Sequence, residues 1–197
     1  MRFTDADHPA DPYPGSWPGR SFTHDDGVGR PLDDLPAGGV PVLAYGSNRC
    51  PAKITWLRQT LGLAGPVHVL AARTTGLAAV WAWGLRERDG SRPATLAARP
   101  GHVETHAVWW ASPAQLTVLD VCEGRGVRYE RHTLPPGMVV TDELGPLQPR
   151  VYLGFSPDRM PLLVAGRPVL VADVGQAAAL GLVGDPAPDD GLPRLPG

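Results

Sequence analysis

The chain has 197 residues, of which 43% are hydrophobic and 19% charged, a balance that predicts one globular domain with a sizeable core. Its 18 Lys and Arg residues stand against 20 Asp and Glu residues, a formal net charge of −2, so no long-range positive field is available to hold nucleic acid or an anionic membrane. Since the N-terminus lacks the apolar stretch of a secretory signal and no run of about 18 apolar residues exists, we expect a soluble, cytoplasmic protein.

The two ends of the chain differ in composition from its middle. Residues 1–39 are rich in Pro, Gly and Asp and show no sustained hydrophobic period, which predicts an irregular arm. Its large apolar groups, Tyr13, Trp17 and Phe22, are expected to pack the arm across a hydrophobic surface or the mouth of a cleft. Residues 184–197 are aperiodic in the same way and are expected to form a flexible tail. The domain itself is then expected at 40–183.

Within that domain the pattern predicts mostly strands and a few helices. A short buried strand at 42–45 precedes a helix at 51–61 that begins with proline, which suits a first helical turn. Ser112 to Gln115 form a capping box that starts a helix ending near Cys122. A weaker signal predicts a last helix from 173 to 182. Further strands are predicted at 67–80, 94–99, 104–111, 127–134 and 150–155. The expected fold class is α+β, as a mixed sheet or small β-barrel flanked by short helices.

The most informative segment is the turn Tyr45-Gly46-Ser47-Asn48 between the first strand and the first helix. Backbone N–H groups at such a junction lack partners and can bind a carboxylate or a developing oxyanion. Gly46 is the one residue of the turn that adopts positive φ freely. An ordinary tight turn with capping side chains is the alternative.

A second candidate lies about 75 residues later, in Leu119-Asp120-Val121-Cys122-Glu123-Gly124. Glu123 follows a buried helical run at a helix C-terminus, where the macrodipole and low dielectric both disfavour its charged form and raise its pKa. A carboxyl with a raised pKa suits a general acid/base. The alternative is a solvated residue at a helix end. Asp120 competes for the role, but we prefer it as structural support paired with a nearby arginine.

Neighbouring residues carry weaker signals. Tyr129 lies on the next strand and either shapes a pocket beside Glu123 or belongs to the core. His102 and His106 flank Glu104 in a predicted strand, outside any zinc-protease spacing, so we expect no metal. Cys122 is expected to pack rather than react, and Lys53, the chain's one lysine, is attributed to coding bias.

Taken together, the motifs resemble those of γ-glutamylcyclotransferase-like proteins over about residues 40–155. The order of the motifs is that of the family, and they are Tyr45-Gly46-Ser47-Asn48, Ala94-Thr95-Leu96, Val108-Trp109-Trp110, Leu119-Asp120-x-x-Glu123-Gly124, Tyr129-x-Arg131 and Val151-Tyr152-Leu153. One departure is that family members commonly have a further tyrosine shortly after the last of these strands, whereas residues 156–160 contain none.

The resemblance implies a small β-barrel with a cavity in which Glu123 faces the turn at Tyr45, Gly46, Ser47 and Asn48. It also implies a transferase- or lyase-type cyclisation, without a cofactor, in which the α-amine of a γ-glutamyl group attacks its own γ-carbonyl. The products would be 5-oxoproline and the released amine. Glu123 would be the general acid/base, and the turn and Tyr129 would bind the substrate.

Two alternatives remain from the sequence. In the first, the protein is a non-catalytic member of the family that binds a small metabolite or a peptide end in the same cavity. In the second, it is a scaffold or interaction protein whose cavity is filled by its own side chains. The partner expected is a small γ-glutamyl compound, with no nucleic acid and no membrane. The sequence does not name the amine that leaves or the oligomeric state.

Overall fold

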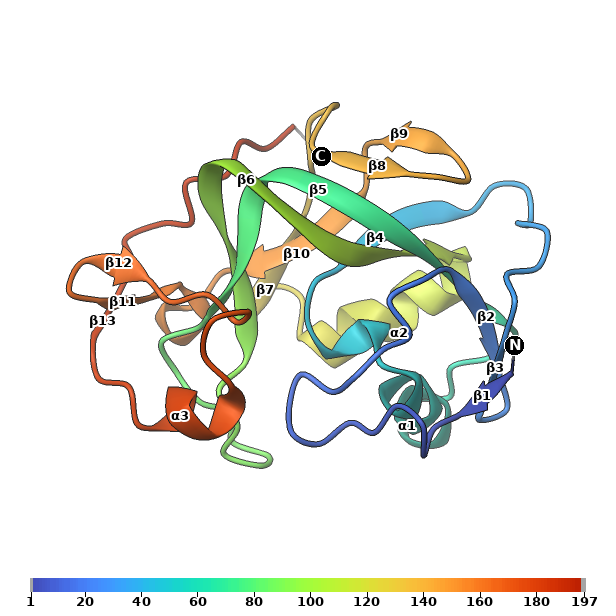
Figure 1. Cartoon of the computed structure of the whole chain (residues 1–197), viewed down its shortest axis with the longest axis horizontal. Coiled ribbons are helices and arrows are strands. Elements are labelled where there is room, and N and C mark those ends of the chain that lie inside the picture. Colours follow the sequence, from blue (N-terminus) through green and yellow to red (C-terminus); the bar gives the residue numbers. More distant parts are fainter. Residues whose placement is uncertain (1, 196–197) are drawn as a thin grey trace.

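The computed structural model describes residues 2–195; residue 1 of the predicted arm and residues 196–197 of the predicted tail lie outside the described residues. Figure 1 shows the arrangement of the elements along the chain. The helices are α1 (Pro51–Leu61), α2 (Pro113–Glu123) and α3 (Gln176–Leu180), with short turns η1 (Ser47–Arg49) and η2 (Pro157–Arg159). The strands are β1 (Phe3–Thr4), β2 (Phe22–Asp25), β3 (Val28–Arg30), β4 (Val40–Ala44), β5 (Val67–Trp81), β6 (Ala94–Ala111), β7 (Tyr129–Thr133), β8 (Val139–Thr141), β9 (Gly145–Leu147), β10 (Arg150–Gly154), β11 (Leu162–Val164), β12 (Arg167–Pro168) and β13 (Asp185–Pro186).

The main sheet is mixed, which confirms the α+β class, but it is open. Its order is β1-β3-β2-β5-β6-β4-β10-β7, with β8 and β9 branching from β5. Strands β4 and β10 pair in parallel and the other paired neighbours run antiparallel. Within residues 2–195 the end strands β1 and β7 do not pair with each other, so the expected closed barrel is wrong. Strands β2 and β8 occupy the edge of β5 that faces away from β6.

The β5–β6 hairpin is the largest unit of the sheet. The sequence predicted two strands at 94–99 and 104–111, whereas the structure has one strand of 18 residues, β6. The bend between the two predicted pieces is accommodated by a register shift in the ladder between Thr75 and Leu77 of β5. A bulge of this kind bends a strand without ending it.

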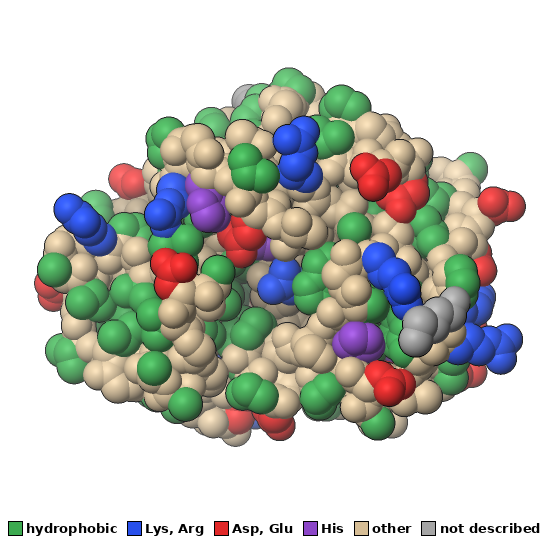
Figure 2. Space-filling view, viewed as in Figure 1, with side chains coloured by type: hydrophobic (Ala, Val, Ile, Leu, Met, Phe, Trp, Pro, Cys, Tyr) green, Lys and Arg blue, Asp and Glu red, His purple; other side chains and the backbone are tan. Residues whose placement is uncertain are grey.

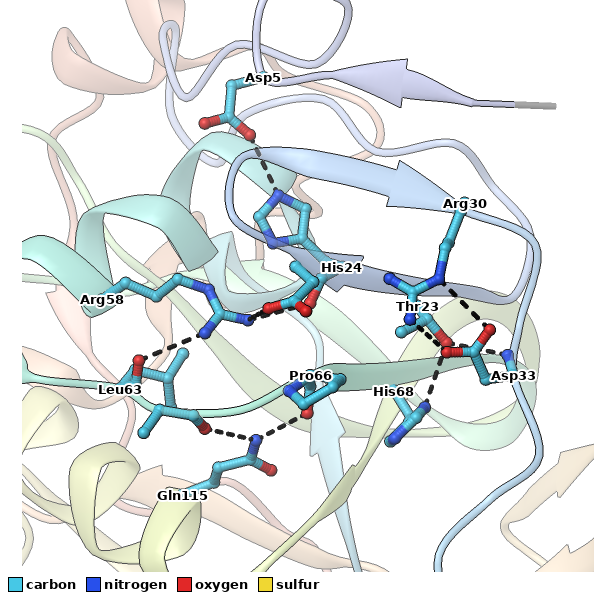
Figure 3. A network of polar contacts seen from close by, with 12 residues as sticks. Asp5, Thr23, His24, Arg30, Asp33, Arg58, Leu63, Pro66, His68 and Gln115 are labelled. Carbon is cyan, nitrogen blue, oxygen red and sulfur yellow. Dashed lines mark hydrogen bonds and ion pairs between the residues drawn. The ribbon is translucent and has the colours of Figure 1, made fainter.

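The N-terminal segment contains three strands, β1, β2 and β3, where the sequence predicted an irregular arm, and β2 joins the segment to β5 of the main sheet. Phe22 of β2 pairs with Val69 of β5 and is 1% exposed. Polar contacts hold the same edge, as Figure 3 shows: His24 Nε2 lies 3.2 Å from Asp5 Oδ1, and Thr23 Oγ1 lies 3.1 Å from His68 Nδ1. The arm is therefore part of the sheet.

The described part of the C-terminal tail is also packed, contrary to the expected flexibility. Strand β13 pairs with β11, and Leu192 is buried. The buried Asp190 carboxylate accepts a hydrogen bond of 2.7 Å from Arg194. The backbone N–H of Leu195 donates to Thr133 O of β7 at 3.1 Å.

Helices α1 and α2 lie side by side under β4 (Figure 1) and bury one face each against the sheet. Helix α1 begins with proline at its first position and ends at Gly62, which adopts the left-handed conformation. In α2 the predicted capping box is present, since Ser112 Oγ accepts from Gln115 N and Gln115 Oε1 accepts from Ser112 N. The residues packed between helices and sheet include Ile54, Leu57, Leu116, Leu119, Trp109 and Phe22.

Charged side chains of both signs are dispersed over the face shown in Figure 2 rather than gathered into a field of one sign. This agrees with the near-balanced composition. Across residues 2–195, none of the helices has the length and apolar character needed to span a membrane.

Candidate active site

A cavity of about 840 Å³ opens where β4 ends, between the first two helices and the sheet. Its walls come from segments far apart in the sequence: the arm, the turn after β4, α1, the β5–β6 loop, the end of α2, β7, β10 and η2. Glu123 and all four residues of the Tyr45–Asn48 turn line it. The scaffold alternative, which required a cavity filled by the protein's own side chains, is therefore wrong.

The turn residues present backbone donors to this cavity. Ser47 begins the short turn η1, and no hydrogen bond within residues 2–195 uses the backbone N–H of Gly46, Ser47 or Asn48. Gly46 has φ −108°, so the turn does not use the positive φ that glycine tolerates. Space favours glycine here, since a Cβ at this position would lie 3.0 Å from the Tyr13 hydroxyl oxygen, a tight contact.

Glu123 is the last residue of α2 and reaches the turn directly. Gly124 ends the helix with φ +64°, and Asn48 Nδ2 donates to Glu123 Oε1 at 2.6 Å. Burial raises the pKa of the Glu123 carboxyl, while the Asn48 hydrogen bond and the charges of Lys53 and Arg128 hold that pKa down. The predicted direction of the shift is thus found, with burial as its main cause.

Asp120, one turn before Glu123, forms a clasp between α2 and two strands. Its carboxylate accepts a hydrogen bond of 2.7 Å from Arg131 Nη1 of β7 and one of 2.6 Å from the Tyr152 hydroxyl of β10. The backbone carbonyl of Tyr152 in turn accepts from the Tyr45 hydroxyl at 2.6 Å. This chain of contacts fixes the helix end against the turn, as the supporting role predicted for Asp120 requires.

Tyr45 and Tyr129 are both buried and both line the cavity. Tyr129 donates its hydroxyl hydrogen toward Ala94 O at 3.4 Å. Burial raises the pKa of each phenol, so both are neutral donors. The Tyr45 hydroxyl is engaged by Tyr152, which leaves its ring and backbone to shape the pocket.

Several lining residues were missed by the sequence reasoning. Tyr13 of the arm, which was expected to pack across a hydrophobic surface or the mouth of a cleft but not to belong to the site, lies in the wall, where its hydroxyl accepts a hydrogen bond of 2.8 Å from Ala94 N. Lys53 of α1 also lines the cavity. The only feature of the sequence that sets Lys53 apart is that it is the one lysine among 18 basic residues. The other missed residues of the wall include Trp56, Arg86, Arg88, Arg128 and Arg159.

The remaining chemical candidates take structural places. On β6, His102 Nε2 and His106 Nε2 lie 3.5 and 3.3 Å from Glu104 Oε2, which also accepts from Ala79 N at 3.0 Å. No group of three His, Cys, Asp or Glu side chains in the described part of the chain is arranged to hold a metal ion. Cys122 lies in the pocket wall, and burial raises the pKa of its thiol to about 11, which opposes thiolate chemistry.

The fold and the site define an α+β protein in which a half-buried carboxyl and a turn whose backbone N–H groups have no partners are hydrogen-bonded to each other in the wall of one pocket. Comparison with protein-family models and with curated proteins finds no match. Among solved structures, the chain is similar to one named gamma-glutamyl cyclotransferase and to an uncharacterized human protein. Each of these two has 21% identity and a TM-score of 0.49, over 60% of this chain and 68% of the other.

A yeast gamma glutamyl cyclotransferase specific to glutathione is also similar, with 17% identity and a TM-score of 0.38 over 59% of this chain and 69% of that one. At these identities, the function of this chain has to be argued from the geometry of its own site.

Proposed function

We propose that this protein is a γ-glutamyl cyclotransferase-type enzyme that releases 5-oxoproline from a γ-glutamyl amide, with Glu123 as general acid/base. The observation that carries the proposal is the 2.6 Å hydrogen bond from Asn48 to Glu123 inside the pocket. It brings the acidic group and the amide-lined turn to one place. The motifs of the sequence, which resemble those of this family, support the same reading.

The reaction is an intramolecular displacement. The α-amine nitrogen forms a bond to the γ-carbonyl carbon and closes a five-membered ring, while the bond from that carbon to the departing nitrogen breaks. Because both reacting groups belong to one molecule, the protein has mainly to hold the glutamyl chain folded and to move one proton.

Glu123 moves that proton. As a carboxylate it accepts the proton from the attacking amine, and as an acid it passes the proton to the departing nitrogen. A pKa raised by burial suits both halves of this cycle. Asn48 orients the carboxyl through its side-chain amide, and the unpaired N–H groups of Gly46 and Ser47 hold the glutamyl carboxylate or the charge on the carbonyl oxygen.

Tyr45 and Tyr129 complete the binding wall. Each is a neutral, buried phenol beside Glu123, so neither competes with it for the proton. Their rings exclude water from the folded glutamyl chain, which favours attack by the amine over hydrolysis.

The test is 5-oxoproline release from a panel of γ-glutamyl dipeptides and γ-glutamylamines. Wild type is expected to form product from at least one of them. Glu123→Gln keeps the size and the Asn48 contact but cannot take the proton, so its kcat is expected to fall by about 10²–10⁴-fold. Glu143→Gln, the same change at an exposed position, is the matched control.

Product formation by Glu123→Gln at the wild-type rate would contradict the assignment. Calorimetric binding of a γ-glutamyl compound without turnover in wild type would replace it with the non-catalytic binding protein, in which Glu123 acts only as a hydrogen-bond acceptor.

A further inference from the structure

Lys53, which the composition alone led us to set aside, lies in the wall of the cavity. It projects from the first turns of α1 and is 7% exposed, and the groups that affect its pKa include Cys122 and Glu123 at the end of α2. Its ammonium group therefore lies beside the acidic end of the site.

Lys53 forms no direct ion pair among the described residues, although the negative charge of Glu123 acts on it from farther away and raises its pKa against the larger effect of burial. Its Nζ lies 3.4 Å from the ring centroid of Trp56, a cation–π contact. Three other cations of the cavity wall are paired: Arg86 and Arg88 with Asp89, at 2.8 and 3.1 Å, and Arg159 with Asp158 at 2.7 Å. A largely buried side chain whose ammonium forms no direct ion pair in a pocket wall leaves that charge available to an anion bound in the cavity.

A second cation faces the same aromatic ring. The guanidinium carbon of Arg88, from the β5–β6 loop, lies 4.7 Å from the Trp56 centroid. Two positive groups at one indole repel each other, and the charge of Arg88 indeed lowers the pKa of Lys53, with burial as the larger cause. Asp89 already pairs Arg88 at 3.1 Å, so an anion placed at this ring would serve mainly Lys53, with the positive charge of Arg88 adding to its attraction.

We propose that Lys53, Trp56 and Arg88 form an anion-binding subsite for the departing half of the substrate, so that the released amine carries a carboxylate. The identity of the ligand as a departing amine rests on the proposed function, whereas anion binding at Lys53, Trp56 and Arg88 does not. The subsite adjoins Glu123, which hands the proton to the departing nitrogen. A substituent on that nitrogen then lies toward Lys53, while the turn at Gly46–Asn48 serves the glutamyl half.

The kinetic test compares γ-glutamylglycine with γ-glutamylmethylamine, which differ by one carboxylate. Wild type is expected to prefer γ-glutamylglycine by at least about tenfold in kcat/KM, the effect of one charge-assisted contact. Lys53→Met keeps the packing and is expected to abolish the preference, because kcat/KM should fall further for γ-glutamylglycine than for γ-glutamylmethylamine, whereas the change in the pKa of Glu123 affects both substrates. Lys53→Arg is expected to retain most of it. Arg73→Met, which removes one positive charge from an exposed position of β5, should leave the preference unchanged.

A second readout does not depend on turnover. Because Lys53 is the chain's only lysine, selective ¹³C labelling of lysine gives one ε-carbon NMR signal whose pH titration reports its pKa. The charged or titratable groups near it are Arg88, Cys122 and Glu123. In Glu123→Gln, saturating γ-glutamylglycine is expected to shift this titration to higher pH, and γ-glutamylmethylamine to leave it in place.

The outcomes separate the two proposals. Equal use of both substrates by wild type, or an unchanged preference in Lys53→Met, overturns the subsite while the cyclisation stands. Absence of 5-oxoproline from either substrate overturns the cyclisation, and the lysine titration, run then on wild type, still decides the subsite. If the pKa of Lys53 shifts equally with both compounds, or with neither, the anion-binding subsite is contradicted.

Discussion

The Asp120 clasp gives a prediction whose size follows from the structure. Asp120→Asn keeps the shape of the side chain and an acceptor for the Tyr152 hydroxyl, but it removes the negative charge that Arg131 Nη1 contacts with both carboxylate oxygens at 2.7 Å. Arg131 is 12% exposed and Asp120 is 23% exposed. The substitution therefore leaves a guanidinium largely buried without its acid.

The expected loss follows from the burial of this pair. A hydrogen bond to a charged group contributes about 1.5–3 kcal/mol, and removing one partner of a buried ion pair costs about 3–5 kcal/mol. Because Asp120 is partly exposed, we expect a loss below that of a fully buried ion pair and near the value for a charged hydrogen bond, about 2–3 kcal/mol. For a chain of this size that corresponds to a fall in Tm of about 4–12 °C. Product formation should fall too, since the clasp also holds α2 against the turn.

Urea titrations of wild type, Asp120→Asn, Arg131→Met and the double variant measure the free energy of unfolding and the coupling between the two groups. Arg125→Met is the control, because Arg125 contacts the same carboxylate at 3.3 Å but is 45% exposed. It is expected to change the free energy of unfolding by no more than about 0.5 kcal/mol. A loss in Asp120→Asn as small as that of the control, or no coupling with Arg131, would refute the reasoning.

Two further predictions concern the pocket itself. Burial raises the pKa of Glu123 above its ordinary value of 4.5, so the stability this carboxyl contributes in its protonated form is lost as the pH rises from about 4.5 through the folded-state pKa. Glu123→Gln cannot ionise and should gain stability relative to wild type over that interval; urea titrations at several pH values check this, and a difference independent of pH would contradict it. Tyr13→Phe removes the acceptor of the 2.8 Å hydrogen bond from Ala94 N and should lower the free energy of unfolding by about 1–2 kcal/mol. An unchanged denaturation midpoint would show that the Ala94 N–H finds another partner.

What the sequence predicted well is encoded locally. The start of α2 depends on Ser112 and Gln115, three residues apart, and its end on Gly124, so a short window contains the whole signal. The same holds for the junction from β4 to α1, where Pro51 opens the helix as expected. These two segments carry Glu123 and the turn, so the central pair of the site could be predicted.

What the sequence did not reveal depends on distant partners. Phe22 is in a strand because Val69 of β5 lies beside it, and nothing within the arm itself specifies that pairing. Tyr13 and Lys53 enter the cavity wall from the arm and from α1, and their role follows from residues brought near only by the tertiary fold. The open sheet could not be predicted for the same reason, because closure into a barrel depends on which distant strands pair at the two edges of the sheet.

The bond between Asn48 and Glu123 joins positions 75 residues apart. Closing so long a loop costs entropy that only the assembled sheet and helices repay. The two halves of the site therefore meet only after most of the tertiary structure has formed. On the proposed function, a partly folded chain would neither cyclise nor consume a substrate, and specific activity would measure the fraction of molecules that have completed folding.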